Sequence, residues 1–350
     1  MNEERVTYEG TKVFIGIDVH KKFYVLCAVV EGQVVKRSRI EPVGENLLGL
    51  MRKYFEGAEI CSCYEGGFSG FGLHRYLVRN GIKNIVVHAA SVEVEARNRV
   101  KTDKRDSLKL AEQLSAGRLR GIRIPSEEEE CRRLLTRTRD QLVCSESRIR
   151  NQIRSKFHQF GLFPWQDDRA LSRNMVREIL KRGVNEELDI AVKSLVSIWE
   201  VIGKEKRQVE QSLKDQALKD PLEQMWVQMP GSGFVTARIL CNELGDMSQF
   251  PNERAVYSFS GLTPWEHSSG ENVRRGHISR QGSSRLRHVL VEAAWRAVKK
   301  DTELKKAFDR IGARRGKKRA IVAVARKLLG RQRALLKEWR ENEITLKQAA

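Results

Sequence analysis

The first part of the chain alternates between short apolar runs and amphipathic stretches. Apolar runs over Val13–Ile17, Tyr24–Val30 and Gln33–Arg39 predict three successive strands, and Gly32 favours a turn between the second and the third. Beyond them the pattern predicts helix, strand, helix, strand and helix in turn, over Leu47–Phe55, Glu59–Tyr64, Gly70–Asn80, Asn84–His88 and Asp106–Gly117. We therefore expect an α/β domain at this end of the chain.

Helical spacing dominates the rest of the sequence. Ser126 and Glu129 form a capping box before a long amphipathic run over Cys131–Phe160, and a second long helix is expected over Ile190–Leu213. Residues 161–189 are the expected connection. Such a pair is typical of an antiparallel hairpin or of a coiled coil that forms dimers.

The last part of the chain is expected to be mostly helical. Two glycines in Met229–Ala237 precede a helix, in a pattern that resembles a helix-hairpin-helix turn, whose backbone N–H groups grip a phosphate. Further helices are expected over Val289–Val298 and Ala320–Arg340. The chain thus divides into an α/β domain (1–125), a helical or coiled-coil domain (126–220) and a mostly helical domain (221–350).

Four carboxylates occupy informative places in the first domain. Asp18 ends the first strand, Glu65 follows the fourth, and Asp103 and Asp106 lie one helical turn apart where the last helix begins. The order of strands and helices, with acids at these places, is that of an RNase H-like domain. Any one of these acids alone fits a turn or a cap, but together they are expected to converge. Converging carboxylates repel one another unless cations neutralise them, and magnesium does so in enzymes of phosphoryl transfer.

Charge and cysteine content narrow the class of protein. The 350 residues hold 65 Lys and Arg against 45 Asp and Glu, a formal net charge of +20, which favours a polyanionic partner such as nucleic acid. Residues 271–350 alone hold 23 Lys and Arg against 8 Asp and Glu. The six cysteines show no zinc-site spacing, and neither a signal peptide nor an apolar run of membrane-spanning length is present. A cytoplasmic protein without a membrane partner is expected.

Five segments together carry a resemblance that extends over nearly the whole chain. The segments are Gly16–Lys21, Tyr64–Gly67, Lys101–Asp106, Met229–Gly233, and His267–Gly270 together with Gly276–Gly282. On these segments the sequence resembles the DEDD transposases of the bacterial insertion-sequence "one-ten" family, which are relatives of the Piv DNA invertase.

The resemblance implies a mechanism and partners. The first domain would be RuvC-like and would hold Mg²⁺ through Asp18, Glu65, Asp103 and Asp106. A catalytic serine would fall at Ser269, with Ser268 as the neighbouring candidate. The protein would act as a homo-oligomer, a dimer or a tetramer, in which one subunit's serine meets another's acidic site. A bridge RNA that pairs with both donor and target DNA would direct it.

The residues themselves suggest how the chemistry would divide. Attack of a serine hydroxyl on a phosphodiester leaves a covalent phosphoserine, which conserves the bond for rejoining. Three arginines that follow, Arg274, Arg275 and Arg280, would either offset charge on the phosphate or only position it. Arg285 and Arg287 are expected to bind nucleic acid together with these three. Without the resemblance, Ser268 and Ser269 would be interpreted as an ordinary polar turn.

Other interpretations remain open at this point. A RuvC-like junction nuclease that uses water fits the same four acids, and so does a site-specific invertase that needs no RNA. A covalent intermediate would exclude the water-using nuclease. A nucleic-acid-binding protein with an inactive RNase H-like fold is disfavoured because all four acids are present. An actin-like sugar kinase shares the Gly-x-Asp of the first strand, but the phosphate-loop glycines do not follow.

Overall fold

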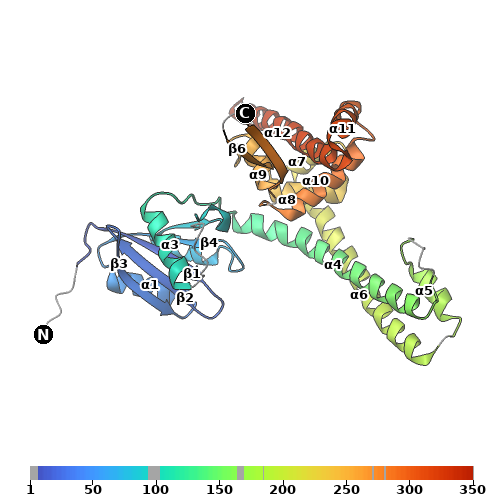
Figure 1. Cartoon of the computed structure of the whole chain (residues 1–350), viewed down its shortest axis with the longest axis horizontal. Coiled ribbons are helices and arrows are strands. Elements are labelled where there is room, and N and C mark those ends of the chain that lie inside the picture. The colour runs from blue at the N-terminus through green and yellow to red at the C-terminus, as the bar shows by residue number, and fades with distance from the viewer. Residues whose placement is uncertain are drawn as a thin grey trace. The chain divides into compact units, whose positions relative to one another are not determined.

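The computed structural model describes residues 7–93, 103–163, 169–183, 185–269, 272–279 and 281–349. The chain divides into two compact units, Met1–Ile124 and Pro125–Ala350, each described below by itself. Figure 1 shows the first unit in blue to cyan and the second in green to red.

A five-stranded mixed sheet organises the first unit. The strand order is β3-β2-β1-β4-β5, in which β1, β2 and β3 run antiparallel while β4 and β5 run parallel to β1. The strands are β1 (Lys12–Val19), β2 (Tyr24–Val30), β3 (Gln33–Ile40), β4 (Glu59–Glu65) and β5 (Lys83–Val87). The expected α/β domain is confirmed, and each of the five strands lies within a few residues of its predicted place.

Helices pack on both faces of this sheet because β1 is apolar on both sides. Val13, Ile15 and Ile17 are fully buried against α1 (Gly44–Tyr54) and α2 (Gly72–Arg79). The alternate residues of β1 face α3 (Asp103–Ser115), whose buried residues include Leu110 and Ala111. The short 3₁₀ helix η1 (Ala89–Ser91) follows β5. A sheet covered on both faces leaves its strand ends as the places where polar groups gather.

The second unit begins with a helical hairpin. Helices α4 (Glu127–Gln159) and α6 (Glu186–Leu218) run antiparallel, since Arg139 near the start of α4 binds Glu210 near the end of α6, at 2.8 Å. The capping box of Ser126 and Glu129 is present. The connection differs from expectation because it contains α5 (Arg173–Leu180), a short amphipathic helix that buries Val176 and Ile179. Eight residues give too short a periodic pattern to stand out in the sequence.

In the described residues after α6, six helices and one hairpin complete the second unit. The helices are α7 (Pro221–Val227), α8 (Phe234–Leu244), α9 (Glu253–Phe259), α10 (Ser284–Ala297), α11 (Thr302–Arg315) and α12 (Lys317–Ala349). They share one apolar core, which includes the fully buried Trp226. The mostly helical character of this region is confirmed.

A two-stranded hairpin was not expected in this region. Strands β6 (Pro264–Ser269) and β7 (Asn272–Ile278) pair antiparallel. Their sequences are polar and lack an alternating apolar face, so the pattern that announces a half-buried strand is missing. The backbone of Ser268 pairs with Val273 and that of Ser269 with Asn272, so both serines lie in a strand rather than in a turn.

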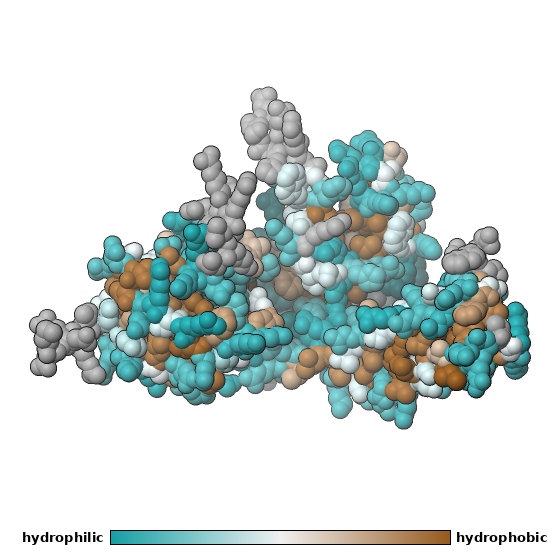
Figure 2. All heavy atoms as spheres, turned by 60° about the horizontal axis from the view of Figure 1, so that its bottom comes forward, coloured by the Kyte–Doolittle hydropathy of each residue, from teal (hydrophilic) through white to brown (hydrophobic). Residues whose placement is uncertain are grey.

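Hydrophilic residues cover much of the face shown in Figure 2, with hydrophobic residues visible in patches between them. Among the described residues, none of the helices has the length and apolar content that a membrane span requires.

Candidate active site

Two of the four carboxylates lie at the ends of adjacent parallel strands. Ile17 of β1 pairs with Tyr64 of β4, so Asp18 and Glu65 follow at matching positions. Side chains alternate along a strand, so Asp18 shares a face with Gly16 and Glu65 shares a face with Cys63. Cys63 Sγ donates to the carbonyl of Leu110 in α3, at 3.6 Å. Both acids are therefore on the face of the sheet that α3 covers.

Gly16 sets how closely α3 approaches this face. A Cβ atom at Gly16 would lie 2.1 Å from the carbonyl oxygen of Ser107 and 2.5 Å from the amide nitrogen of Ala111. Only a residue without a side chain lets the helix backbone rest against β1 in this way. The first turn of α3, which carries Asp103 and Asp106, is thereby held beside the end of β1.

His20 links the strand to the helix. Its Nε2 lies 3.0 Å from Oδ2 of Asp18 and 3.5 Å from Oδ1 of Asp103. Single ligand atoms of Asp18, His20 and Asp103 all lie within 4.8 Å of one another. The backbone N–H of His20 donates to the carbonyl of Phe23, and the two rings lie 4.8 Å apart. The contact between His20 and Asp103 could not be predicted from the sequence, because it depends on the packing of α3.

The electrostatics of the site centre on Asp18, whose side chain is 22% exposed. Burial raises the pKa of Asp18 above its usual value, and the negative charges of Asp103 and Asp106 raise that pKa further, while His20 lowers it. The carboxylates thus lie close enough to repel one another. The N-terminus of α3 offsets part of that repulsion, because the first turn of a helix favours negative charge.

The structure therefore brings three of the predicted acids close together and places the fourth on the same face. Asp18 and Asp103 lie within ligand distance of a common point, and Asp106 is near enough to raise the pKa of Asp18. Glu65 is exposed at the end of β4 and lies outside this closest group. The donor set is mainly carboxylate oxygen, which is chemically suited to a hard divalent cation.

The other predicted residues lie in the second unit. The structure describes the backbone but not the side chains of Ser268, Ser269, Arg274 and Arg275, and Arg280 lies outside the described residues. Arg285 forms an ion pair with Asp140 at 2.9 Å and lies 3.7 Å from Glu243. Arg287 donates to the carbonyl of Gly282 at 3.4 Å. Arg285 and Arg287 thus have partners within the chain, and the DNA-binding role of the five arginines stays a prediction.

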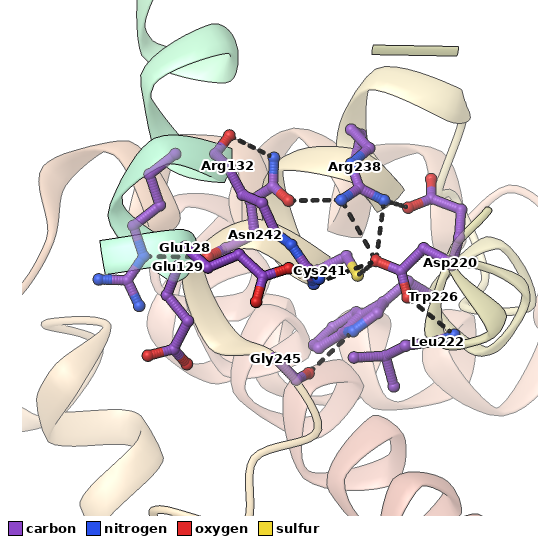
Figure 3. A network of polar contacts seen from close by, with 12 residues as sticks. Glu128, Glu129, Arg132, Asp220, Leu222, Trp226, Arg238, Cys241, Asn242 and Gly245 are labelled. Carbon is purple, nitrogen blue, oxygen red and sulfur yellow. Dashed lines mark hydrogen bonds and ion pairs between the residues drawn. The ribbon is translucent and has the colours of Figure 1, made fainter. Parts of the chain in front are cut away.

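A second concentration of charge surrounds Arg238 of α8, whose side chain is 1% exposed (Figure 3). Its guanidinium donates to Glu223 at 2.8 Å and to Asp220 at 3.2 Å. It also donates to Oδ1 of Asn242 at 2.6 Å, and the amide of Asn242 donates to the carbonyl of Arg132 in α4. These contacts tie α7, α8 and α4 together.

Glu243 extends this network toward α4. Both of its carboxylate oxygens accept hydrogen bonds from Arg137, at 3.0 and 3.1 Å, and Arg133 lies 3.9 Å away. Unlike Asp18, whose charged neighbours are a histidine and two carboxylates, each carboxylate of this network faces an arginine. The network is therefore suited to holding helices together rather than to binding an ion.

Two family models match parts of this chain. Residues 15–161 match a family model described as a transposase, of the DEDD IS110 type, and residues 225–309 match the model of the transposase IS116/IS110/IS902 family. Together the two matches cover well over half of the chain.

Curated relatives match over most of their length. A "putative transposase y4qE" of Sinorhizobium fredii is 28% identical, over 96% of this chain and 92% of its own. The "transposase for insertion sequence element IS1111A" of Coxiella burnetii is 26% identical, over 89% of this chain and 86% of its own. The "transposase for insertion sequence element IS1533" of Leptospira borgpetersenii is 26% identical, over 81% of this chain and 85% of its own.

Proposed function

Because the chain belongs to the IS116/IS110/IS902 family of transposases, which are DNA-recombining enzymes, we propose that it cuts and exchanges DNA strands at the acidic site of its first unit. The observation that carries the proposal is the convergence of Asp18, Asp103 and Asp106 beside the end of β1. The strand order β3-β2-β1-β4-β5 supports an RNase H-like, RuvC-like fold for this unit.

The carboxylates are suited to holding magnesium. Asp18 and Asp103 would supply ligand oxygens, with Asp106 and Glu65 completing the donor set from the same face of the sheet. Magnesium bound there supplies Lewis-acid stabilisation of charge on a phosphate and its leaving oxygen. His20 would hold the carboxylate of Asp18 in place through its 3.0 Å hydrogen bond.

The covalent step is assigned to a serine of β6. The Oγ of Ser269, or of Ser268 in its place, would bond to phosphorus while one deoxyribose oxygen leaves and takes up a proton. One phosphoester forms for each one broken, so the reverse step can rejoin strands without another energy source. Family membership supports this assignment. Both serines lie side by side at the end of β6.

The partners follow from charge and family. The net charge of +20 favours a nucleic-acid partner, and we propose donor DNA, target DNA and a bridge RNA that pairs with both. A homo-oligomer, a dimer or a tetramer, would let the serine of one subunit act with the acids of another.

Trapping of protein–DNA adducts tests the chemistry. Purified protein is incubated with magnesium, supercoiled donor DNA and the RNA that co-purifies with it, and adducts are separated by denaturing electrophoresis. Ser269→Ala is expected to abolish the adduct, while Ser268→Ala retains it. Asp18→Asn is expected to abolish both cleavage and adduct. Adduct with each single serine variant, but none with the double variant, would mean that either hydroxyl can react.

The same assay distinguishes the proposed mechanism from the alternative enzymes. Cleaved DNA without any adduct would replace the proposal with a RuvC-like nuclease that uses water. Adduct formation with protein stripped of RNA would instead favour an invertase that needs no RNA. Sequencing of RNA bound to protein from cells that carry the gene with its flanking DNA is expected to find one discrete RNA from that flank.

A further inference from the structure

A hollow of about 450 Å³ lies where α4, the start of α5 and the middle of α6 meet. Figure 1 shows these three helices together at the far end of the hairpin. Among the described residues that line the hollow, four are cationic, Arg150, Arg173, Lys206 and Arg207, and one, Glu146, is a carboxylate. It lies wholly within the second unit and contains none of the residues proposed for cleavage.

The single carboxylate is already engaged. Glu146 Oε1 accepts a hydrogen bond from Nε1 of Trp199 at 3.1 Å, and Oε2 accepts one from Lys206 at 2.5 Å. Burial raises the pKa of Glu146, but these two bonds, together with the charges of Lys206 and Arg150, bring that pKa below its usual value, so the carboxylate is ionised at neutral pH. Glu146 therefore balances Lys206 and leaves the three arginines without an equal number of acids in the hollow.

Two of the arginines lie near the ring of Trp199. The guanidinium of Arg173 lies 5.2 Å from the Trp199 ring, and that of Arg150 lies 5.9 Å from it. Arg173 also donates to the carbonyl of Trp199 at 3.2 Å. Arg173, which has both contacts, loses less freedom than an unheld side chain on meeting a ligand, which favours binding.

Gly203 leaves room on α6 for the side chain of Arg173. A Cβ atom at Gly203 would lie 2.7 Å from the Arg173 guanidinium. Cations gathered in one partly buried hollow repel one another, and an anion that enters removes that repulsion. Arginine is the side chain best suited to binding a phosphate through paired hydrogen bonds.

We propose that this hollow, lined by Arg150, Arg173, Lys206 and Arg207, binds a backbone phosphate of a nucleic acid. The choice of nucleic acid as the polyanion rests on the proposed function. The hollow itself does not, because it rests on the contacts of α4, α5 and α6. DNA and RNA share the phosphodiester chemistry that these cations recognise, and experiment separates them.

The test compares charge changes inside and outside the hollow. Binding of full-length protein to a short mixed-sequence DNA duplex and to an RNA hairpin is measured by fluorescence anisotropy in EDTA, so that no strand is cut. The double variant Arg150→Gln with Arg207→Gln is expected to bind about tenfold more weakly or worse. The matched control, Arg148→Gln with Lys214→Gln, removes two exposed cations from the same hairpin outside the hollow and is expected to lose less than about threefold.

A variant that is expected to bind more tightly distinguishes a lost contact from a folding defect. Glu146→Gln keeps an acceptor for Trp199 but removes the negative charge, so it is expected to tighten binding. The exposed Glu205→Gln on α6 is its control and is expected to tighten binding less. A variant that merely damaged the fold would weaken binding instead.

The outcomes separate cleanly. A selective loss with DNA, with RNA or with both supports the hollow and names its ligand. Equal losses in the hollow and control pairs would overturn the proposal, as would tightening by Glu146→Gln no greater than by Glu205→Gln. The proposal would also be overturned if poly-glutamate bound as tightly as the nucleic acids and lost as much affinity in the hollow variant, since the hollow would then not select phosphate. Because no strand is cut, failure here leaves the cleavage proposal standing, and failure of cleavage leaves this one standing.

Discussion

The acids around Asp18 and the network around Arg238 are two clusters of charge with opposite construction. Around Asp18, carboxylates gather with one histidine and repel one another, and the cluster is open to solvent. Around Arg238, which is 1% exposed, the guanidinium meets Asp220 and Glu223, Arg132 lies 3.9 Å from Asp220, and the neighbouring Glu243 meets Arg137. An unbalanced, accessible cluster can bind a cation, whereas a balanced, buried one can only hold its helices together. The balance of charge thus separates the candidate site from a structural network.

The largest loss of stability is expected from breaking the balanced cluster. Arg238→Met leaves Glu223 buried without its cation, and Asp220 with only the more distant Arg132, and should lower the free energy of unfolding by about 3–5 kcal/mol. Urea unfolding followed by tryptophan fluorescence measures this loss. Adding Glu223→Gln to Arg238→Met should restore part of it, because one of the two stranded charges is removed. A double variant as unstable as the single one would show that the two groups are not coupled.

A smaller loss of stability, but a large loss of activity, is expected from Gly16→Ala. The added Cβ would overlap the backbone of α3 at Ser107, so the helix must shift, at a cost of about 1–3 kcal/mol. The shift carries Asp103 and Asp106 away from Asp18, so strand cleavage should fall with the acids intact. Gly49→Ala, at a site with open space around it, is the control. Full cleavage by Gly16→Ala would show that the approach of α3 does not set the site.

The acids around Asp18 are expected to affect how the free energy of unfolding depends on pH. The pKa of Asp18 is raised in the folded protein, so between the unfolded and folded pKa values the folded state binds more protons. At neutral pH the ionised Asp18 therefore lowers the free energy of unfolding. This effect disappears as the pH falls below the pKa that Asp18 has in the unfolded chain. Without divalent cations, Asp18→Asn should be more stable than the wild type at pH 7, and the difference should shrink toward pH 4. A difference that grows on acidification would contradict the assigned direction.

The smallest effect is expected at a balanced but exposed pair. Lys305 and Asp309, one turn apart on α11, lie 2.6 Å apart with side chains that are 53% and 55% exposed. Asp309→Asn should change the free energy of unfolding by less than about 0.5 kcal/mol, because solvent screens such pairs. Thermal unfolding of this variant sets the baseline for the others. A loss of unfolding free energy as large as that of Arg238→Met would mean that burial does not explain how much the Arg238 network contributes to stability.

Much of the first unit could be predicted from the sequence. Its strands are apolar runs separated by turns, and the placement of Asp18 and Glu65 at strand ends follows directly from the strand boundaries. What required the structure was the packing of α3: the bridge from His20 to Asp103 and the need for a glycine at position 16 depend on contacts between residues distant in sequence.

The second unit was less predictable. The polar strands β6 and β7 lack an apolar face, and α5 is too short for its periodicity to be distinctive. The hollow around Trp199 joins Arg150, Arg173 and Arg207 from three helices, and no spacing in the sequence announces it. The roles of Ser268 and Ser269 rest on family resemblance, because a pair of serines has no distinctive pattern of its own.

Cation binding by the first unit tests the central claim most directly. Binding of Mn²⁺, as a spectroscopic substitute for Mg²⁺, is titrated by electron paramagnetic resonance with the wild type, Asp18→Asn and the control Asp309→Asn. The account predicts a bound ion whose affinity falls more than about tenfold in Asp18→Asn and is unchanged in Asp309→Asn. Binding by Asp18→Asn that equals the wild type would contradict the assignment of these carboxylates as a cation site.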